Sequence, residues 1–276
     1  MAEPEPSTTR SLASLPLLVL AGIAEALCLH CTEDPDFDRW HTPIHGGGGH
    51  ALVSSSRALA NLAATCKTLY DIVSPILYHQ PLAFPKRHVR LLRTLISRPD
   101  LARRVKVLRL DLDIGYGQCE NEDDETFVLD LAARHGWSAE TNLPEYHPDR
   151  DKKVDDDLPP NLLITTCPNL EKFSMGIGYG TNFALLKPAT LPRLKDVYIT
   201  HSDTEMGTCL GALQELYLAA PYLETFTSNM TAGVAVDGGE VMPLGNLRHV
   251  RLDWSSISGN SLRALSRAQP VPWSMC

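Results

Sequence analysis

The chain contains 276 residues, of which 43% are hydrophobic and 21% charged, a composition that predicts a globular protein of one or two domains. Its formal net charge of −8 argues against nucleic acid as the main partner, because such partners are bound by a surplus of Lys and Arg. Seven cysteines without a disulfide-framework spacing indicate a reducing compartment, and we expect a cytoplasmic or nuclear protein.

The first predicted element is an apolar helix over residues 15–29. Pro16 suits a first helical turn, where its missing N–H costs nothing, and Ser14 is a candidate cap before it. Leu20 and Ile23 then recur at helical spacing. Because apolar residues also occupy the other faces, we expect this helix to be buried or to meet a partner.

The second predicted helical segment covers residues 59–78. Apolar residues from Leu59 to Val73 recur at intervals of one and three, with polar residues between them, and Pro75 is expected to end the regular pattern. The stretch between the two segments, residues 32–53, is rich in Gly and His and is predicted to be an inserted loop.

These two segments together resemble an F-box of the fungal type. The resemblance rests on Leu15-Pro16, on Ile23 eight positions after Leu15, and on the pair Cys66-Lys67 before an aromatic residue. It covers a helical domain at residues 12–83, preceded by a tail at 1–11 whose Pro, Glu, Ser and Thr predict disorder. The resemblance implies docking on the Skp-type adaptor of a cullin ubiquitin ligase. The candidate adaptor-binding residues are Leu15, Pro16, Leu20, Ile23, Leu69 and Tyr70.

Two other interpretations of the first helix stay open. It is compatible with a helical cap on some other kind of domain. A secretory signal is the second alternative, but Glu3 and Glu5 precede the apolar run and Glu25 interrupts it, whereas a signal needs a basic start and an uncharged centre. The same charge makes the run a poor membrane span, so we expect no membrane partner.

A repeated pattern follows in the C-terminal two-thirds. Each copy has an apolar anchor and a second apolar residue three positions later, and all but one have a third at five positions. The anchors are Val105, Leu170, Leu194, Leu223 and Leu247. Because side chains alternate along a strand, the residues at +3 and +5 are predicted to share one buried face. The run at residues 213–218 also fits the pattern but lies too close to Leu223, and we assign it to the preceding helix.

The copies look like leucine-rich repeats, since the last three anchor intervals are 24, 29 and 24 residues. We therefore predict an α+β protein in which the F-box module precedes an α/β leucine-rich-repeat-like solenoid at 84–276. The usual Asn eight positions after the anchor is absent, so the turns must close by other means. The interval before Leu170 is predicted to carry an acidic insert at 115–160. No capping repeat is visible at the end, and we expect a chain that is short for its architecture.

Charge is segregated along the chain. Residues 86–109 hold nine Lys and Arg and one acid, whereas residues 110–160 hold fifteen acids and four Lys and Arg. The basic run is a candidate for binding an acidic partner, but such runs are more often solvated, and here it is also expected to complement the acidic insert.

A zinc site is the one chemical alternative that carries some weight. Cys28 and Cys31 form a C-x-x-C pair, and His41, His45 and His50 follow, so two thiolates and two imidazoles are available. The spacing is weak, and we assign no metal and no cofactor. No catalytic set is recognised either, so no enzyme activity is expected.

The predicted function is that of a substrate-recognition subunit of a Skp–cullin–F-box ubiquitin ligase, with an unidentified protein target bound by the repeats. A non-catalytic repeat scaffold that never meets an adaptor is the alternative, and a small zinc protein is a third.

Overall fold

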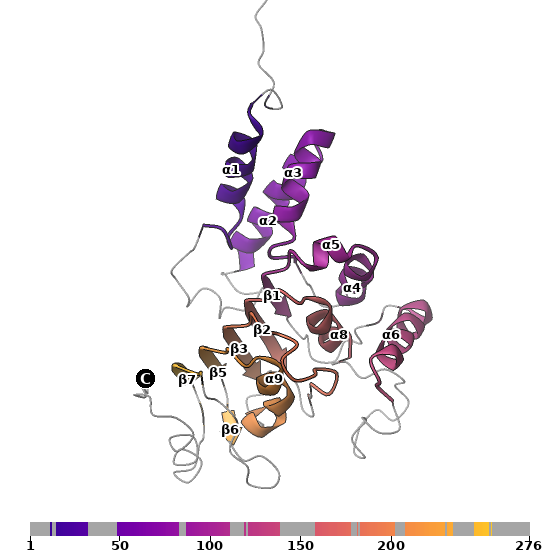
Figure 1. Cartoon of the computed structure of the whole chain (residues 1–276), viewed down its shortest axis with the longest axis vertical. Helices are drawn as coiled ribbons and strands as arrows, with labels where there is room; N and C mark the ends of the chain where they lie inside the picture. Colours follow the sequence, from indigo (N-terminus) through magenta and orange to yellow (C-terminus); the bar gives the residue numbers. More distant parts are fainter. Residues whose placement is uncertain are drawn as a thin grey trace, which may run out of the picture.

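The structure is a computed structural model, and it combines a helical module with a mixed α/β part (Figure 1). It describes residues 12, 15–32, 49–82, 87–110, 119, 121–138, 158–177, 181, 183–201, 208–229, 231–233, 246–253 and 255. Among these residues, none of the helices is both long enough and apolar enough to cross a membrane. The tail at 1–11 and the segment after 255 lie outside the described residues, as does the candidate cap Ser14.

The helical module consists of α1 (Leu17–Leu27), α2 (Gly49–Ala63) and α3 (Lys67–Leu77). Helix α3 packs against both of the others, and the three share one apolar core. That core is made of Leu20, Ala24, Cys28, Leu59, Ala63, Leu69, Val73 and Ile76. The first helix matches the predicted 15–29 segment within two residues at each end, with Pro16 just before its first turn.

The prediction of one helix over 59–78 is wrong. Helix α2 ends at Ala63 and α3 begins at Lys67, because Cys66 between them takes an extended conformation (φ −162°, ψ 165°). Pro75 also lies inside α3 instead of ending the pattern. The loop predicted at 32–53 is too long at its C-terminal side, since α2 already begins at Gly49.

The α/β part is built on a parallel sheet of five strands whose order follows the chain. The strands are β1 (Val107–Leu110), β2 (Lys172–Ile177), β3 (Asp196–His201), β5 (Thr225–Asn229) and β7 (His249–Asp253). A separate pair is formed by β4 (Thr208–Cys209) and β6 (Thr231–Gly233). The structure is thus mixed α/β, compatible with the predicted α+β class.

The sheet register agrees with the predicted repeat pattern. The +3 residues Leu108, Phe173 and Val197 are partners across adjacent strands, as are Phe226 and Val250 further along the sheet. The +5 positions form a second such row, and all five anchors are buried. Val250 is only half-buried, at the far edge of the sheet. The period-two prediction of one buried face is confirmed for β2 and β3, whereas β1 is buried on both faces, β5 is buried at three consecutive positions, and the +3 and +5 residues of β7 are only half-buried.

Helices cover that apolar face. Helix α4 (His88–Ser97), followed by the short α5 (Pro99–Ala102), packs on α8 (Leu158–Thr166), and α9 (Gln214–Ala219) lies further along the sheet (Figure 1). Their apolar residues join those of the strands in a single core. The run at residues 213–218 lies in the turn η3 (Leu210–Leu213) and in α9, as its assignment to a helix predicted.

Adjacent repeats are joined by backbone groups at the start of each strand. The carbonyl of Lys106 accepts from the N–H groups of Glu171 and Lys172, at 2.7 and 3.0 Å, and the same two-to-one arrangement recurs along the sheet. The Asn169 side chain donates to the Arg103 carbonyl at 2.8 Å, and an equivalent Asn precedes the last anchor. In these two repeats, an Asn just before the anchor therefore connects adjacent repeats. The Asn that leucine-rich repeats usually carry eight positions after the anchor is absent.

The acidic insert contains the helix that the sequence indicates at Phe127–Arg134, and that helix begins earlier than expected. Helix α6 (Glu122–Arg134) lies inside it, and the Asn121 side chain caps this helix by accepting from the Asp124 N–H at 2.9 Å. Helix α8 also begins within the predicted bounds. Arg93 of α4 pairs with Asp124 at 3.1 Å and lies over the Phe127 ring at 4.3 Å. The basic segment therefore does complement the acidic insert at this point.

Candidate functional site

The two most exposed large apolar side chains of the described residues lie at the start of α1. Leu17 is 63% exposed and Leu18 is 87% exposed, and Leu15 and Val19 beside them are also open to solvent. Apolar residues run around this helix on every side, so its inward face fills the core while the rest stays uncovered. We call the four residues Leu15, Leu17, Leu18 and Val19 the α1 apolar patch.

The predicted adaptor-binding residues are divided between this surface and the core. Leu15, Pro16 and Tyr70 are exposed, and Ile23 is half-buried. Leu20 and Leu69 are only 1% and 2% exposed and lie in the core of the module, where they hold α1 against α3. A partner bound at this surface would meet the first three directly, whereas Leu20 and Leu69 would act by maintaining the fold.

Sequence reasoning missed Leu17 and Leu18 as candidate contact residues. Helical spacing singles out the side chains of the buried face, and these two lie elsewhere on the helix. The available signal was the absence of a polar face on α1, which indicates a helix that is buried or meets a partner.

The start of α1 and the start of α3 lie at the same end of the module. Cys28, just after α1, is close to the end of α3, with its Sγ 3.9 Å from the Ile76 carbonyl oxygen, so the two helices run in the same direction. Figure 1 shows their N-terminal ends pointing away from the sheet. The α1 apolar patch is therefore presented at the far end of the molecule.

The second candidate surface is the face of the sheet opposite the helices. One register row across it consists of Arg109, Ser174, Tyr198, Thr227 and Arg251. Burial raises the pKa of Tyr198, against the opposing influence of the neighbouring Thr200 and Asn229. Arg109 and Thr227 of this row are buried, Ser174 and Tyr198 are half-buried, and Arg251 is exposed, so the accessible polar groups lie toward the β7 edge of the sheet.

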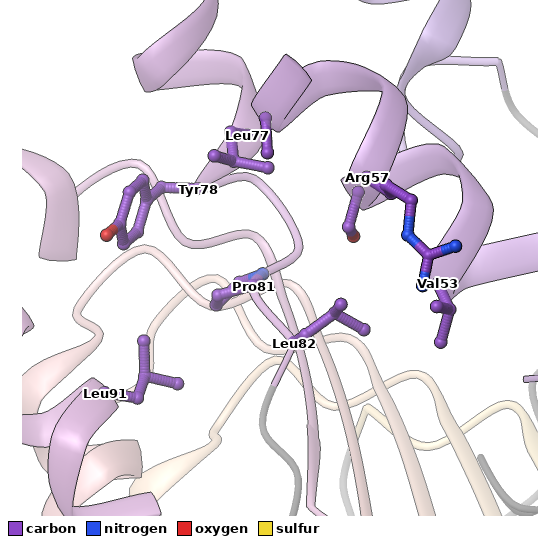
Figure 2. Close-up of a pocket in the computed structure, with 9 residues that line it drawn as sticks. Val53, Arg57, Leu77, Tyr78, Pro81, Leu82 and Leu91 are labelled. Carbon is purple, nitrogen blue, oxygen red and sulfur yellow. The ribbon is translucent and has the colours of Figure 1, made fainter. Parts of the chain in front are cut away.

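A pocket of about 420 Å³ lies where the helical module meets α4. Figure 2 shows Val53 and Arg57 on one side of it and Leu91 on the other, with Pro81 and Leu82 between. Its lining is mostly apolar, and Arg57 is the charged residue among those that line it. The described residues that line the pocket include no carboxylate, histidine or cysteine.

Four metal-binding side chains converge at the base of the module. These are Cys28, His30 and Cys31, from the turn after α1, and His79, from the segment after α3; we call them the Cys/His cluster. One ligand atom from each lies within 4.8 Å of all the others. The Sγ of Cys31 is 3.3 Å from Nδ1 of His79 and 3.7 Å from Nδ1 of His30.

The surroundings of the cluster determine its charge state. Burial lowers the pKa of His79 to about 4, and the neighbouring His30 lowers it further. Burial also lowers the pKa of His30, although the negative charge of Glu171 acts in the opposite direction. Both imidazoles are therefore neutral at pH 7. Burial, with Cys28 beside it, raises the pKa of Cys31 to about 12, so without a cation this thiol keeps its proton.

The sequence alternative joined Cys28 and Cys31 with His41 and His45. The structure brings the two cysteines together with His30 and His79 instead. His41 and His45 lie outside the described residues, as does the side chain of His50. His79 was missed because it lies 48 residues from Cys31, a separation that no short spacing motif spans.

No protein-family model matches the chain, and no curated protein matches it. Its function must therefore be argued from the surfaces and side chains described above.

Proposed function

We propose that the chain is a non-catalytic substrate-recognition subunit of a Skp–cullin–F-box type ubiquitin ligase. In this proposal the helical module binds the Skp-type adaptor, and the α/β part binds a protein target. The observation that carries it is the α1 apolar patch, two of whose leucines are 63% and 87% exposed on a helical module that precedes a chain-ordered parallel sheet. Large apolar groups left open on a folded surface are typical of an interaction site.

The patch supplies apolar surface that a partner can bury. Burying one leucine side chain stabilises a complex by about 1.5–3 kcal/mol, so Leu17 and Leu18 together contribute about 3–6 kcal/mol. Tyr70, which is 49% exposed, adds an aromatic group with a polar end. Such a surface fits a helix-in-groove contact with an apolar partner.

The polar face of the sheet supports the target-binding half of the proposal. Tyr198, which is half-buried, and Arg251, which is exposed, lie in one register row across it. Guanidinium and phenol groups are enriched in the centres of protein interfaces, because they combine apolar area with directional hydrogen bonds. Ubiquitin transfer would then be catalysed elsewhere in the complex, and this chain would contribute only proximity.

The test is binding of the purified full chain to a recombinant Skp-type adaptor, measured by calorimetry. The double variant Leu17→Asp/Leu18→Asp is expected to weaken binding by at least about 100-fold, since it removes about 3 kcal/mol or more of apolar burial. Tyr222→Asp is the matched control, because Tyr222 is 59% exposed on the α/β part, and it should leave the affinity unchanged.

Two outcomes would contradict the proposal. The first is the absence of measurable adaptor binding by the wild-type chain, which would favour the free-standing binding scaffold. The second is full retention of affinity in the double variant. Leu69→Asp is not a suitable test, because Leu69 lies in the core and its loss would unfold the module.

A further inference from the structure

The Cys/His cluster has the composition and placement of a metal site, and the proposed function does not use it. We propose that Cys28, His30, Cys31 and His79 bind a structural zinc ion that fastens the helical module to the parallel sheet. The inference is independent of adaptor binding, since it concerns the interior junction of the chain and not its exposed end.

The ligand separations suit tetrahedral zinc. With Zn–S bonds near 2.3 Å and Zn–N bonds near 2.0–2.1 Å, ligand atoms in a tetrahedron lie about 3.3–3.8 Å apart. Cys31 Sγ is already 3.3 Å from His79 Nδ1 and 3.7 Å from His30 Nδ1. All four ligand atoms lie within 4.8 Å of one another, so closure around an ion needs side-chain shifts of the order of 1 Å.

The donor set selects the metal and its role. Two thiolates and two imidazoles favour zinc over the harder Mg²⁺ and Ca²⁺, which prefer oxygen ligands. Four protein ligands close the tetrahedron and leave no position for water or substrate, which is typical of a structural site. Binding displaces one proton from each thiol, so the two thiolates neutralise the charge of the ion.

The backbone holds the ligands in place from two directions. After α1 ends, Cys31 N–H and Thr32 N–H both donate to the Cys28 carbonyl, at 3.0 and 3.1 Å, and this turn brings the two cysteines of the C-x-x-C pair together. His79 is fixed by the sheet, since its carbonyl accepts from the N–H groups of Lys106 and Val107 at 2.8 and 3.0 Å. The ligands are thus positioned by backbone hydrogen bonds that exist without an ion.

A carboxylate stands behind one of the ligands. His30 directs Nδ1 to the cluster, and its Nε2 is 3.8 Å from Oε2 of Glu171, which also forms an ion pair with Lys106. Metal-binding histidines usually present their second nitrogen to such an acceptor, which fixes the orientation of the ring. Glu171 and Lys106 lie just before β2 and β1, so this outer shell connects the site to the first two repeats.

An ion at this position would join three separate parts of the molecule. Cys28 and Cys31 follow α1, His79 follows α3, and Glu171 precedes β2. Cys31, after α1, and His79, after α3, are 48 positions apart in the chain. A zinc ion would therefore hold the ends of α1 and α3 together and, through the His30–Glu171 contact, connect them to the start of β2.

Elemental analysis of the purified full chain, after incubation with zinc and gel filtration, is the first test. About one zinc per chain is expected, and the double variant Cys28→Ser/Cys31→Ser and the variant His79→Ala should lose it. Cys66→Ser is the matched control, because Cys66 is a half-buried cysteine of the same module outside the cluster, and it should retain the ion. Cobalt substitution should give the visible spectrum of a tetrahedral site with thiolate ligands in the wild type.

Two further variants separate ligation from folding. His79→Cys supplies a new ligand and should retain zinc, whereas His79→Ala should not. Glu171→Gln leaves the four ligands intact and should weaken zinc affinity by about 10–100-fold. Zinc content near zero in the wild type would overturn the proposal, and so would full occupancy in His79→Ala. Loss of zinc in His41→Ala or His45→Ala, with retention in His79→Ala, would overturn the assigned ligand set.

Discussion

Tyr217 provides a prediction whose sign is unusual for a core substitution. Its side chain lies on α9, is 3% exposed, and meets the Phe226 ring edge-on at 5.5 Å and 65°. Its hydroxyl is buried and has no hydrogen-bond partner among the described residues. We therefore predict that Tyr217→Phe stabilises the protein, because it removes an unsatisfied polar group and keeps the ring contact.

The magnitude follows from the desolvation of that hydroxyl. A buried, unsatisfied polar group costs about 1–3 kcal/mol, so the free energy of unfolding should rise by about that amount in Tyr217→Phe. Burial also raises the pKa of Tyr217 well above its ordinary value near 10. The contribution of the neutral phenol is complete below pH ~10 and is lost as the pH rises, because the unfolded chain ionises first. The variant should lose this alkaline decline in stability.

Urea unfolding followed by circular dichroism measures both effects. With a slope of about 1–3 kcal/mol per molar urea, the midpoint should move upward by about 1 M at neutral pH. Tyr222→Phe is the control, since Tyr222 is 59% exposed, and it should change stability by less than about 0.5 kcal/mol. A loss of stability in Tyr217→Phe would refute the reasoning, because it would mean that the hydroxyl has a partner in the folded protein.

Two more predictions test the packing of the α/β part. Phe173→Ala should lower the free energy of unfolding by about 3–5 kcal/mol in the same assay, because it opens a cavity beside Phe183. The centroids of the two rings are 6.3 Å apart. A loss below about 1 kcal/mol would contradict the sheet register. A double-mutant cycle on Arg93→Ala and Asp124→Ala should give a coupling energy below about 1 kcal/mol, since the Arg93 side chain is 42% exposed. This coupling energy should fall further as salt is added. A larger coupling energy that does not depend on salt would contradict the prediction.

The strand register is where sequence reasoning worked best. Leu108, Phe173 and Val197 were placed on one face by anchor spacing alone, and they are partners across the sheet. Side chains alternate between the two faces of a strand, so the face of each residue can be predicted from its position in the sequence. Helix limits were less accurate, because the interruption at Cys66 keeps the apolar spacing almost unbroken while the backbone changes direction.

The sequence did not predict which apolar side chains are exposed or which distant residues lie close together. Leu18 and Leu20 are both leucines of α1, yet one is 87% and the other 1% exposed, because α3 covers only one side of the helix. The meeting of Cys31 with His79 depends in the same way on how α3 packs beside α1.

The sequence by itself determined the repeat spacing and the identity of the apolar face in β2 and β3, since both follow from neighbouring residues. Only the tertiary structure decided which leucines of α1 stay open to a partner and which histidine joins the C-x-x-C pair. Both depend on contacts between segments tens of residues apart, and such contacts are selected by the packing of the whole core.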